Sequence, residues 1–214
     1  MNKVKTMRVL EYFDELYPDA CCELNYRNNY ELLVAVMLSA QTTDKKVNQV
    51  TTRLFEKYPD ATAVAASEIK DLEEILKYLG LYKNKAKNLK ALSQVLLDEF
   101  GGVVPDKIEQ LQKLPGVGRK TANVVLVEGF KIPAIPVDTH VTRVAKRLGF
   151  AKVDDDVVKI EAKLQRSIPK ELQVKAHSQF IFFGRYFCKA INPSCGQCEL
   201  FDMCKDEIKY KRTK

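Results

Sequence analysis

Apolar residues recur at intervals of three and four along most of this chain, and the period-two alternation of half-buried strands is absent. A first apolar face runs from Met7 to Tyr17, and the stretch 31–39 is apolar on nearly every side, which predicts a buried core helix. The same spacing predicts further helices over 47–58, 69–76, 86–100, 108–114, 121–127, 139–148, 155–168 and 171–189. The pattern therefore predicts an all-α protein.

Capping and helix-breaking residues divide this series. Asn84 and Asp106 are candidate N-caps, and Gly101-Gly102 is expected to stop the helix that Asn84 begins. The apolar link 132–136 contains two prolines, which exclude a continuous helix there. This link is the best internal boundary, and a length of 214 residues allows one large or two small domains.

Composition narrows the class of protein. The 35 Lys and Arg residues outnumber the 28 Asp and Glu residues, giving a formal net charge of +7. This excess is compatible with a polyanionic partner, and equally with solubility alone. No apolar run reaches the roughly 20 residues needed to cross a bilayer, and the N-terminal residues lack the apolar core of an export signal. We therefore expect an intracellular protein whose six cysteines are ligands or free thiols rather than disulfides.

The most informative stretch is 114–122, Leu-Pro-Gly-Val-Gly-Arg-Lys-Thr-Ala, which opens directly into a predicted helix. Gly116 and Gly118 permit positive φ and the close approach of another backbone. Such a turn aims unpaired N–H groups outward at the positive end of a helix dipole, so it favours an anion such as a DNA phosphate. Lys120 lies in the first helical turn, where its amine is either a phosphate ligand or a nucleophile.

Two further signals lie C-terminal to this turn. Asp138, in Val137-Asp138-Thr139-His140, begins another predicted helix, where N-capping is its expected role and does not exclude catalysis. Near the end of the chain, four cysteines with the spacing C-x6-C-x2-C-x5-C should share one metal centre: Cys188, Cys195, Cys198 and Cys204. Zinc and iron–sulfur clusters both take four cysteine ligands, but the two short C-x-x-C pairs familiar from zinc sites are missing.

The glycine hairpin, the Val137–His140 segment and the cysteine spacing, in this order, resemble the endonuclease III family of helix-hairpin-helix DNA glycosylases over essentially the whole chain. The resemblance implies two helical domains with a cleft between them. It assigns 22–132 to a central domain with the hairpin, and 1–21 plus 133–214 to a domain in which the N-terminal helix packs with the C-terminal helices. It also implies one [4Fe–4S] cluster on the four cysteines, which would shape the loop that begins at Cys188.

The function implied by the resemblance is that of a bifunctional DNA glycosylase and AP lyase of base excision repair. Lys120 would attack C1′ of a damaged nucleotide, expel the base and nick the strand by β-elimination, with Asp138 activating the amine or stabilising positive charge on the sugar. The base must first leave the stack, at a cost of a few kcal/mol. The DNA-contacting residues so implied are Gln41, Leu81, Lys83, Lys85, Leu114, Gly116, Val117, Gly118, Arg119, His140 and Lys189.

Substrate and context follow from the same resemblance. Adenine-removing relatives carry a carboxylate where this chain has Ala35, and they usually lack the lysine at 120, so oxidised or ring-saturated pyrimidines are the expected lesions. The expected partner is damaged double-stranded DNA, bound by a monomer in the bacterial cytoplasm or nucleoid, without a membrane. The alternatives are an adenine or mismatch glycosylase of the same superfamily, a non-catalytic helix-hairpin-helix DNA-binding module and an iron–sulfur electron carrier.

Overall fold

The computed structural model describes residues 2–207, and these residues form helices, turns and loops without a β-strand. The chain divides into two compact units, one comprising Met1–Cys22 and Ile132–Lys214 and the other Glu23–Lys131. Each unit is described separately below. Within the described range, no helix is both long and apolar enough to cross a membrane. The predicted all-α class is confirmed.

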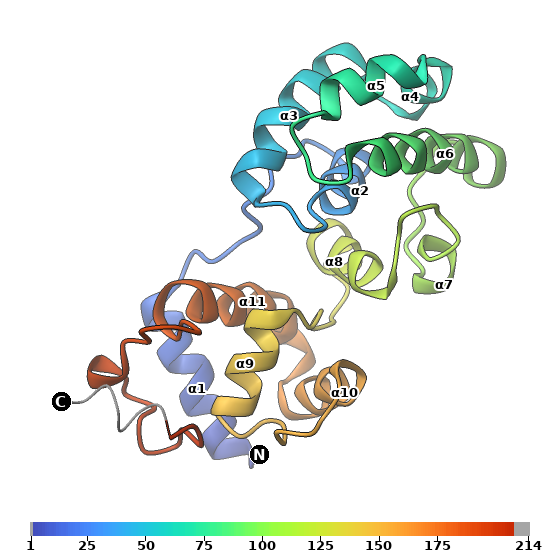
Figure 1. The fold of residues 1–214 in the computed structure, drawn as a ribbon. Coiled ribbons are helices and arrows are strands. Elements are labelled where there is room, and N and C mark those ends of the chain that lie inside the picture. Colours follow the sequence, from blue (N-terminus) through green and yellow to red (C-terminus); the bar gives the residue numbers. More distant parts are fainter. Residues whose placement is uncertain (1, 208–214) are drawn as a thin grey trace. The chain divides into compact units, whose positions relative to one another are not determined.

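The unit 23–131 is built from seven helices along the described chain (Figure 1). Their bounds are α2 Asn29–Leu38, α3 Asp44–Lys57, α4 Ala61–Ala66, α5 Ile69–Leu76, α6 Tyr82–Phe100, α7 Ile108–Leu111 and α8 Arg119–Phe130. The predicted core helix is α2, in which every residue from Tyr30 to Leu38 is buried. It packs against α3, α6 and α8, while α4 and α5 pack on α6. Burying a nearly uniform apolar helix in this way removes apolar surface from water on all sides of α2, which stabilises the unit.

The contact between α2 and α8 depends on a glycine inside α8. A Cβ on Gly129 would lie 2.8 Å from Asn29 Oδ1 and 3.0 Å from Leu32 Cδ2, so only hydrogen allows the two helices to approach this closely. Since α8 follows directly from the glycine hairpin, this packing anchors the hairpin to the buried helix α2.

The other unit combines α1 Lys3–Leu16 with α9 Thr139–Arg147, α10 Val157–Ser167 and α11 Lys170–Phe182 (Figure 1). A π-helical turn, Phe183–Phe187, extends α11, and a 3-10 turn, Cys195–Gln197, lies in the cysteine segment. Rings from both ends of the chain meet in its core: the Phe13 ring centroid lies 5.1 Å from that of Phe180 and 4.5 Å from that of Phe183. The expected return of the N-terminal helix to the C-terminal helices is thus present.

Several element boundaries differ from the predictions. Helix α6 begins at Tyr82 with Leu81 as its N-cap, so Asn84 lies inside its first turn and does not cap it. Likewise Lys107, not Asp106, is the N-cap of α7. Periodicity missed α4 because this helix is short and rich in alanine, although Asp60 marks its start by accepting a hydrogen bond from the Ala63 N–H at 2.8 Å. The predicted stop at Gly101 is confirmed, with φ of 58° at the C-cap.

Candidate functional site

The glycine hairpin is a tight turn between α7 and α8 whose apolar side chains face inward. Leu114 and Val117 are buried, and the Val117 N–H donates to the Leu114 carbonyl at 3.0 Å. Gly116 has φ of +80°, and a Cβ there would lie 3.0 Å from the Asn88 amide nitrogen and 3.2 Å from Met37 Cγ. The turn is therefore pressed against α6 and α2. Leu114 and Val117, two of the predicted DNA contacts, bury their side chains, and their N–H groups already donate within the turn.

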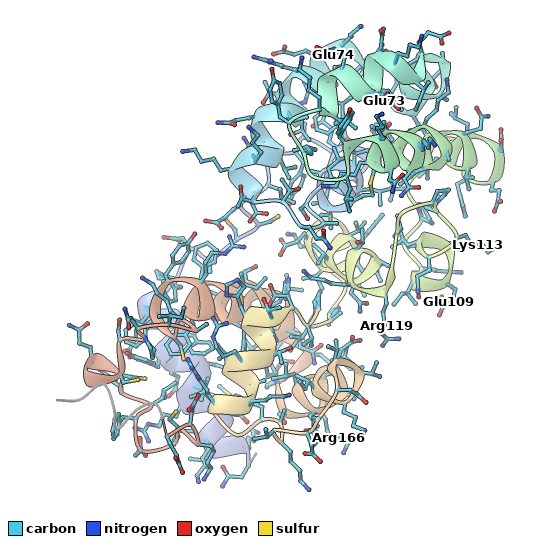
Figure 2. The ribbon with its side chains drawn as sticks, viewed as in Figure 1. Glu73, Glu74, Glu109, Lys113, Arg119 and Arg166 are labelled. Carbon is cyan, nitrogen blue, oxygen red and sulfur yellow. The ribbon has the colours of Figure 1, made fainter. Side chains whose placement is uncertain are left out.

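The start of α8 has the features of an anion site. Gly118 is the N-cap with φ of −85°, and as a glycine it has no side chain to cap the first-turn N–H groups. Those groups lack intrahelical acceptors and lie at the positive end of the helix dipole. Arg119 and Lys120 are both exposed in this first turn, and Figure 2 shows the Arg119 side chain extending from the helix start. Two cations and a set of outward amides can together bind a phosphate.

Lys120 is accessible to a ligand. It is the second residue of α8, its side chain is exposed, and no carboxylate of residues 2–207 forms an ion pair with its amine. An amine in this setting can approach an external electrophile without first breaking a salt bridge. The sequence left open whether Lys120 is a phosphate ligand or a nucleophile, and its exposure is compatible with both roles.

Asp138 occupies the N-cap of α9, as predicted, and accepts a hydrogen bond from the Val141 N–H at 2.8 Å. His140, in the first turn, places Nδ1 3.2 Å from Nη2 of Arg143. A guanidinium can only donate, so in this contact His140 Nδ1 is the acceptor. Asp138 and Lys120 belong to different units.

Gln41 and Leu81 lie on two exposed turns of the unit 23–131. Both residues adopt left-handed backbone conformations that are uncommon for side chains other than glycine, with φ of 55° and 59°. Gln41 is exposed, and 62% of Leu81 is accessible although it is a large apolar residue. The turns are neighbours, since a Cβ on Gly80 would lie 3.9 Å from the Gln41 carbonyl oxygen. Strained, exposed residues of this kind often occur at ligand-binding sites.

The three lysines that follow Leu81 have different environments. Lys83 and Lys87 are exposed, as phosphate contacts need to be. Lys85 is only 5% exposed, and its ammonium donates to the Ala40 carbonyl at 2.8 Å and to Thr42 Oγ1 at 2.9 Å. Desolvation by burial lowers the pKa of Lys85. The expectation of an exposed phosphate contact at Lys85 therefore does not match this geometry.

The four C-terminal cysteines line one cavity together with apolar side chains, among them Leu148, Phe183, Phe187 and Phe201. All four thiols line this one cavity, so a single metal centre with four cysteine ligands, such as an iron–sulfur cluster, fits there. The apolar side chains around it would shield such a centre from water.

Charge in and around this cavity supports a buried metal centre. Burial raises the pKa of Cys198 to about 11, and burial also raises the pKa of Cys188 against the opposing effect of Arg147. Metal ligation requires thiolates, so a positive centre must compensate for the burial. Arg147 contributes to this by placing Nη1 3.4 Å from Cys188 Sγ, and the same atom donates to the Lys189 carbonyl at 2.8 Å. Lys189 itself is exposed.

Sequence reasoning missed the two arginines of α9 that face the cysteine loop. Arg143 donates to the Gly184 carbonyl at 2.6 Å and to the Cys188 carbonyl at 3.1 Å, while Arg147 forms an ion pair with Asp206 at 2.7 Å. Their spacing of four residues places them on one helix face, which was the available signal. Their acceptors outside α9, however, lie 41 or more residues away along the chain.

Comparison with known proteins identifies the class to which this fold and these sites belong. Residues 34–170 match the HhH-GPD superfamily of base excision DNA repair proteins, and residues 188–204 match the iron–sulfur binding domain of endonuclease III. A thermostable thymine-DNA glycosylase shares the fold at a TM-score of 0.85 and 21% identity, over 94% of this chain and 95% of that one.

Closer relatives specify the family. Endonuclease III of Bacillus subtilis is 48% identical over 92% of this chain and 90% of its own length, and that of Escherichia coli K12 is 41% identical over 96% and 97%. The structure of a trapped endonuclease III–DNA covalent intermediate is 48% identical, with a TM-score of 0.94 and complete coverage of both chains. The chain belongs to the endonuclease III family.

This membership confirms the predicted class of enzyme and its cofactor. The chain is a bifunctional base excision repair enzyme that acts on DNA, with DNA glycosylase and AP lyase activities. It belongs to a group that carries a [4Fe–4S] cluster, which Cys188, Cys195, Cys198 and Cys204 are suited to hold.

Proposed function

We propose that this enzyme removes oxidised or ring-saturated pyrimidines from duplex DNA, with Lys120 as the nucleophile. The observation that carries the proposal is the exposed amine of Lys120 in the first turn of α8, directly after the N-cap glycine of the hairpin. A phosphate held by the hairpin would bring the sugar of a nearby nucleotide within reach of this amine. The trapped covalent endonuclease III–DNA intermediate, from a relative 48% identical, supports a covalent route.

The proposed chemistry proceeds in two steps. The neutral amine forms a bond to C1′ while the glycosidic bond breaks, and the base departs with the bonding electrons and takes up a proton. The nitrogen lone pair then forms a C1′=N bond while the C1′–O4′ bond breaks, and a proton lost from the nitrogen is taken up by O4′ as the ring opens. The resulting Schiff base, when protonated, acidifies the C2′ protons. Removal of one C2′ proton then expels the 3′ phosphate by β-elimination, and hydrolysis releases Lys120.

Asp138 is proposed as the carboxylate that accepts the proton from Lys120 or stabilises positive charge on the sugar. One of its oxygens already accepts the Val141 N–H. This bond fixes the side chain at the start of α9 and leaves the second oxygen to act. A positioned acid–base group of this kind typically contributes 10²–10⁴-fold.

The remaining contacts are proposed to hold the distorted duplex. Gln41 and Leu81 would fill the space left by the extruded nucleotide, because both are exposed on adjacent turns. The hairpin and Arg119 would bind DNA phosphates. Three further side chains would do the same: Lys83, His140 and Lys189. The cluster supplies structural support for the loop that begins at Cys188, and no step of the reaction passes through it.

Specificity and context complete the proposal. Ala35 lies in the buried helix α2 and provides no carboxylate for adenine recognition, which supports pyrimidine lesions. We propose that the enzyme acts as a monomer in the bacterial cytoplasm. Its functional domains are taken to be residues 22–132 and residues 1–21 plus 133–214.

Borohydride trapping tests the nucleophile. Lys120→Gln should abolish both the borohydride-trapped adduct on abasic-site duplex and the nicking of the strand, while retaining most of the affinity for DNA. Lys113→Gln is the matched control, because Lys113 is also an exposed lysine close to the hairpin. If Lys120→Gln still gave trapped adduct and nicked product at rates near those of the parent enzyme, Lys120 would not be the nucleophile. Lesion duplexes containing oxidised pyrimidines, 8-oxoguanine or mispaired adenine test the specificity separately.

A further inference from the structure

Lys85 is a buried cation at a place where the neighbouring lysines are exposed. It lies in the first turn of α6, with Lys83 and Lys87 exposed on either side, yet only 5% of its surface is accessible. No carboxylate of the described residues pairs with its ammonium, and both of its hydrogen-bond acceptors are neutral. Burying a charge on neutral partners is costly, so the interaction must serve something that a neutral side chain would not provide.

The ammonium of Lys85 binds the turn that contains Gln41. Its Nζ donates to the Ala40 carbonyl at 2.8 Å and to Thr42 Oγ1 at 2.9 Å, so it binds the residues on both sides of Gln41. Gln41 has φ of 55°. A single residue in this left-handed conformation is unfavourable unless the surrounding structure holds it. The two hydrogen bonds supply that constraint while leaving the Gln41 side chain exposed.

The backbone of Lys85 is tied to the second turn. Its N–H donates to the Leu81 carbonyl at 3.0 Å, the first hydrogen bond of α6, and Leu81 is the left-handed N-cap of that helix with φ of 59°. One residue therefore joins the two exposed turns, one through its side chain and the other through its backbone. A hydrogen bond from a charged donor is roughly twice as strong as a neutral one, which suits this bridging position.

We propose that Lys85 is a positioning residue that holds Gln41 and Leu81 in their left-handed conformations before DNA binds, and that it is not a phosphate contact. This inference rests on the proposed role of Gln41 and Leu81 in filling the space left by the extruded nucleotide. Preorganisation matters there because, if Gln41 and Leu81 became ordered only on binding, the free energy of that ordering would weaken the binding of DNA. Lys85 thus affects catalysis through Gln41 and Leu81 rather than through direct contact with the substrate.

The salt dependence of binding separates this role from phosphate contact. The variants are Lys85→Met, which keeps the length and apolar stem of the side chain, and Lys83→Met as the matched exposed control, because Lys83 is a proposed phosphate contact. A lost phosphate contact lowers the slope of log Kd against log salt by about 0.9. We expect that decrease for Lys83→Met, whereas Lys85→Met should weaken binding to lesion duplex without changing the slope. A slope reduced equally in both variants would identify Lys85 as a phosphate ligand and overturn the proposal.

A double-mutant cycle tests whether Lys85 acts through Gln41. On duplex containing a paired lesion, Lys85→Met and Gln41→Ala should each lower kcat/KM about tenfold, and the double variant should lose little more than either alone. On a single-stranded abasic oligonucleotide, which has no opposite strand and no gap to fill, Lys85→Met should cleave within about twofold of the parent enzyme. Multiplicative losses on the duplex would show independent action and contradict the proposal.

Two further variants protect the test against simple misfolding. Thr42→Val removes one acceptor of the Lys85 ammonium at a half-buried position, so it should lower kcat/KM on duplex less than Lys85→Met does. Lys85→Arg keeps the charge and should be more active on duplex than Lys85→Met. If Gln41→Ala alone had no effect, the gap-filling role would fail and the proposal would fall with it. If Gln41→Ala lowered activity and Lys85→Met and Thr42→Val did not, only the role of Lys85 would be refuted.

Discussion

The two glycines of the hairpin should respond very differently to the same substitution. At Gly116, φ is +80° and an added Cβ would lie 3.0 Å from the Asn88 amide nitrogen and 3.2 Å from Met37 Cγ. At Gly118, φ is −85° and nothing lies within 4 Å of an added Cβ. The backbone conformation and the neighbouring side chains therefore require glycine at 116, whereas no neighbouring atom within 4 Å requires glycine at 118.

The expected magnitudes follow from these surroundings. Gly116→Ala should destabilise the fold by about 1–2 kcal/mol through left-handed backbone strain and by about 1–3 kcal/mol through overpacking. The lower entropy of the unfolded alanine chain offsets about 0.4–1 kcal/mol of this sum. The net loss of roughly 2–4 kcal/mol corresponds to a decrease in Tm of roughly 5–15 °C. Gly118→Ala loses only a preferred N-cap residue, which costs less than about 1 kcal/mol.

Substituting Gly118 should lower the affinity for DNA much more than it lowers stability. If a phosphate lies against the start of α8, a methyl group on residue 118 would displace it and raise Kd about tenfold, or about 1.4 kcal/mol, with Tm nearly unchanged. Gly118→Ser keeps a good N-cap and should weaken binding without loss of stability.

The assays are thermal unfolding by circular dichroism at one scan rate and fluorescence anisotropy with a labelled abasic-analogue duplex at fixed salt. Equal losses of Tm in Gly116→Ala and Gly118→Ala would refute the stability reasoning. Unchanged affinity in Gly118→Ala would refute the phosphate position.

The other predictions concern the cluster and the electrostatics of binding. Cys198→Ser should lower the yield of folded protein and the affinity for DNA more than single-turnover β-elimination, because Cys198 lines the cysteine cavity of one unit while Lys120 belongs to the other unit. Absorption spectra and unfolding curves measure the folded holoprotein, fluorescence anisotropy measures the affinity, and a stable, colourless, fully active variant would contradict this prediction. Lys83→Ala should reduce the salt dependence of duplex binding by a slope of about 0.9, as expected for one lost phosphate contact, without altering lyase activity on a single-stranded abasic oligonucleotide. A salt titration of the parent enzyme that proved flat would refute a phosphate-tracking surface altogether.

The helices and the chemical motifs were predictable from sequence because their signals are local. Apolar spacing identified the buried helix α2, and the stop at Gly101 followed from residues adjacent in the chain. The glycine hairpin and the four-cysteine spacing also lie within short windows, so their chemistry could be inferred before any fold was known. The family and its activity followed from these local signals taken together.

Only the tertiary structure distinguished residues that look alike in the chain. Lys83, Lys85 and Lys87 alternate in one basic run, but only Lys85 is buried, with its ammonium bound to Thr42, 43 residues away along the chain. Arg147 meets the cysteine loop in the same way, across 41 residues. Local sequence encodes which helices form, whereas the burial of a particular cation depends on which distant carbonyl the fold brings to it.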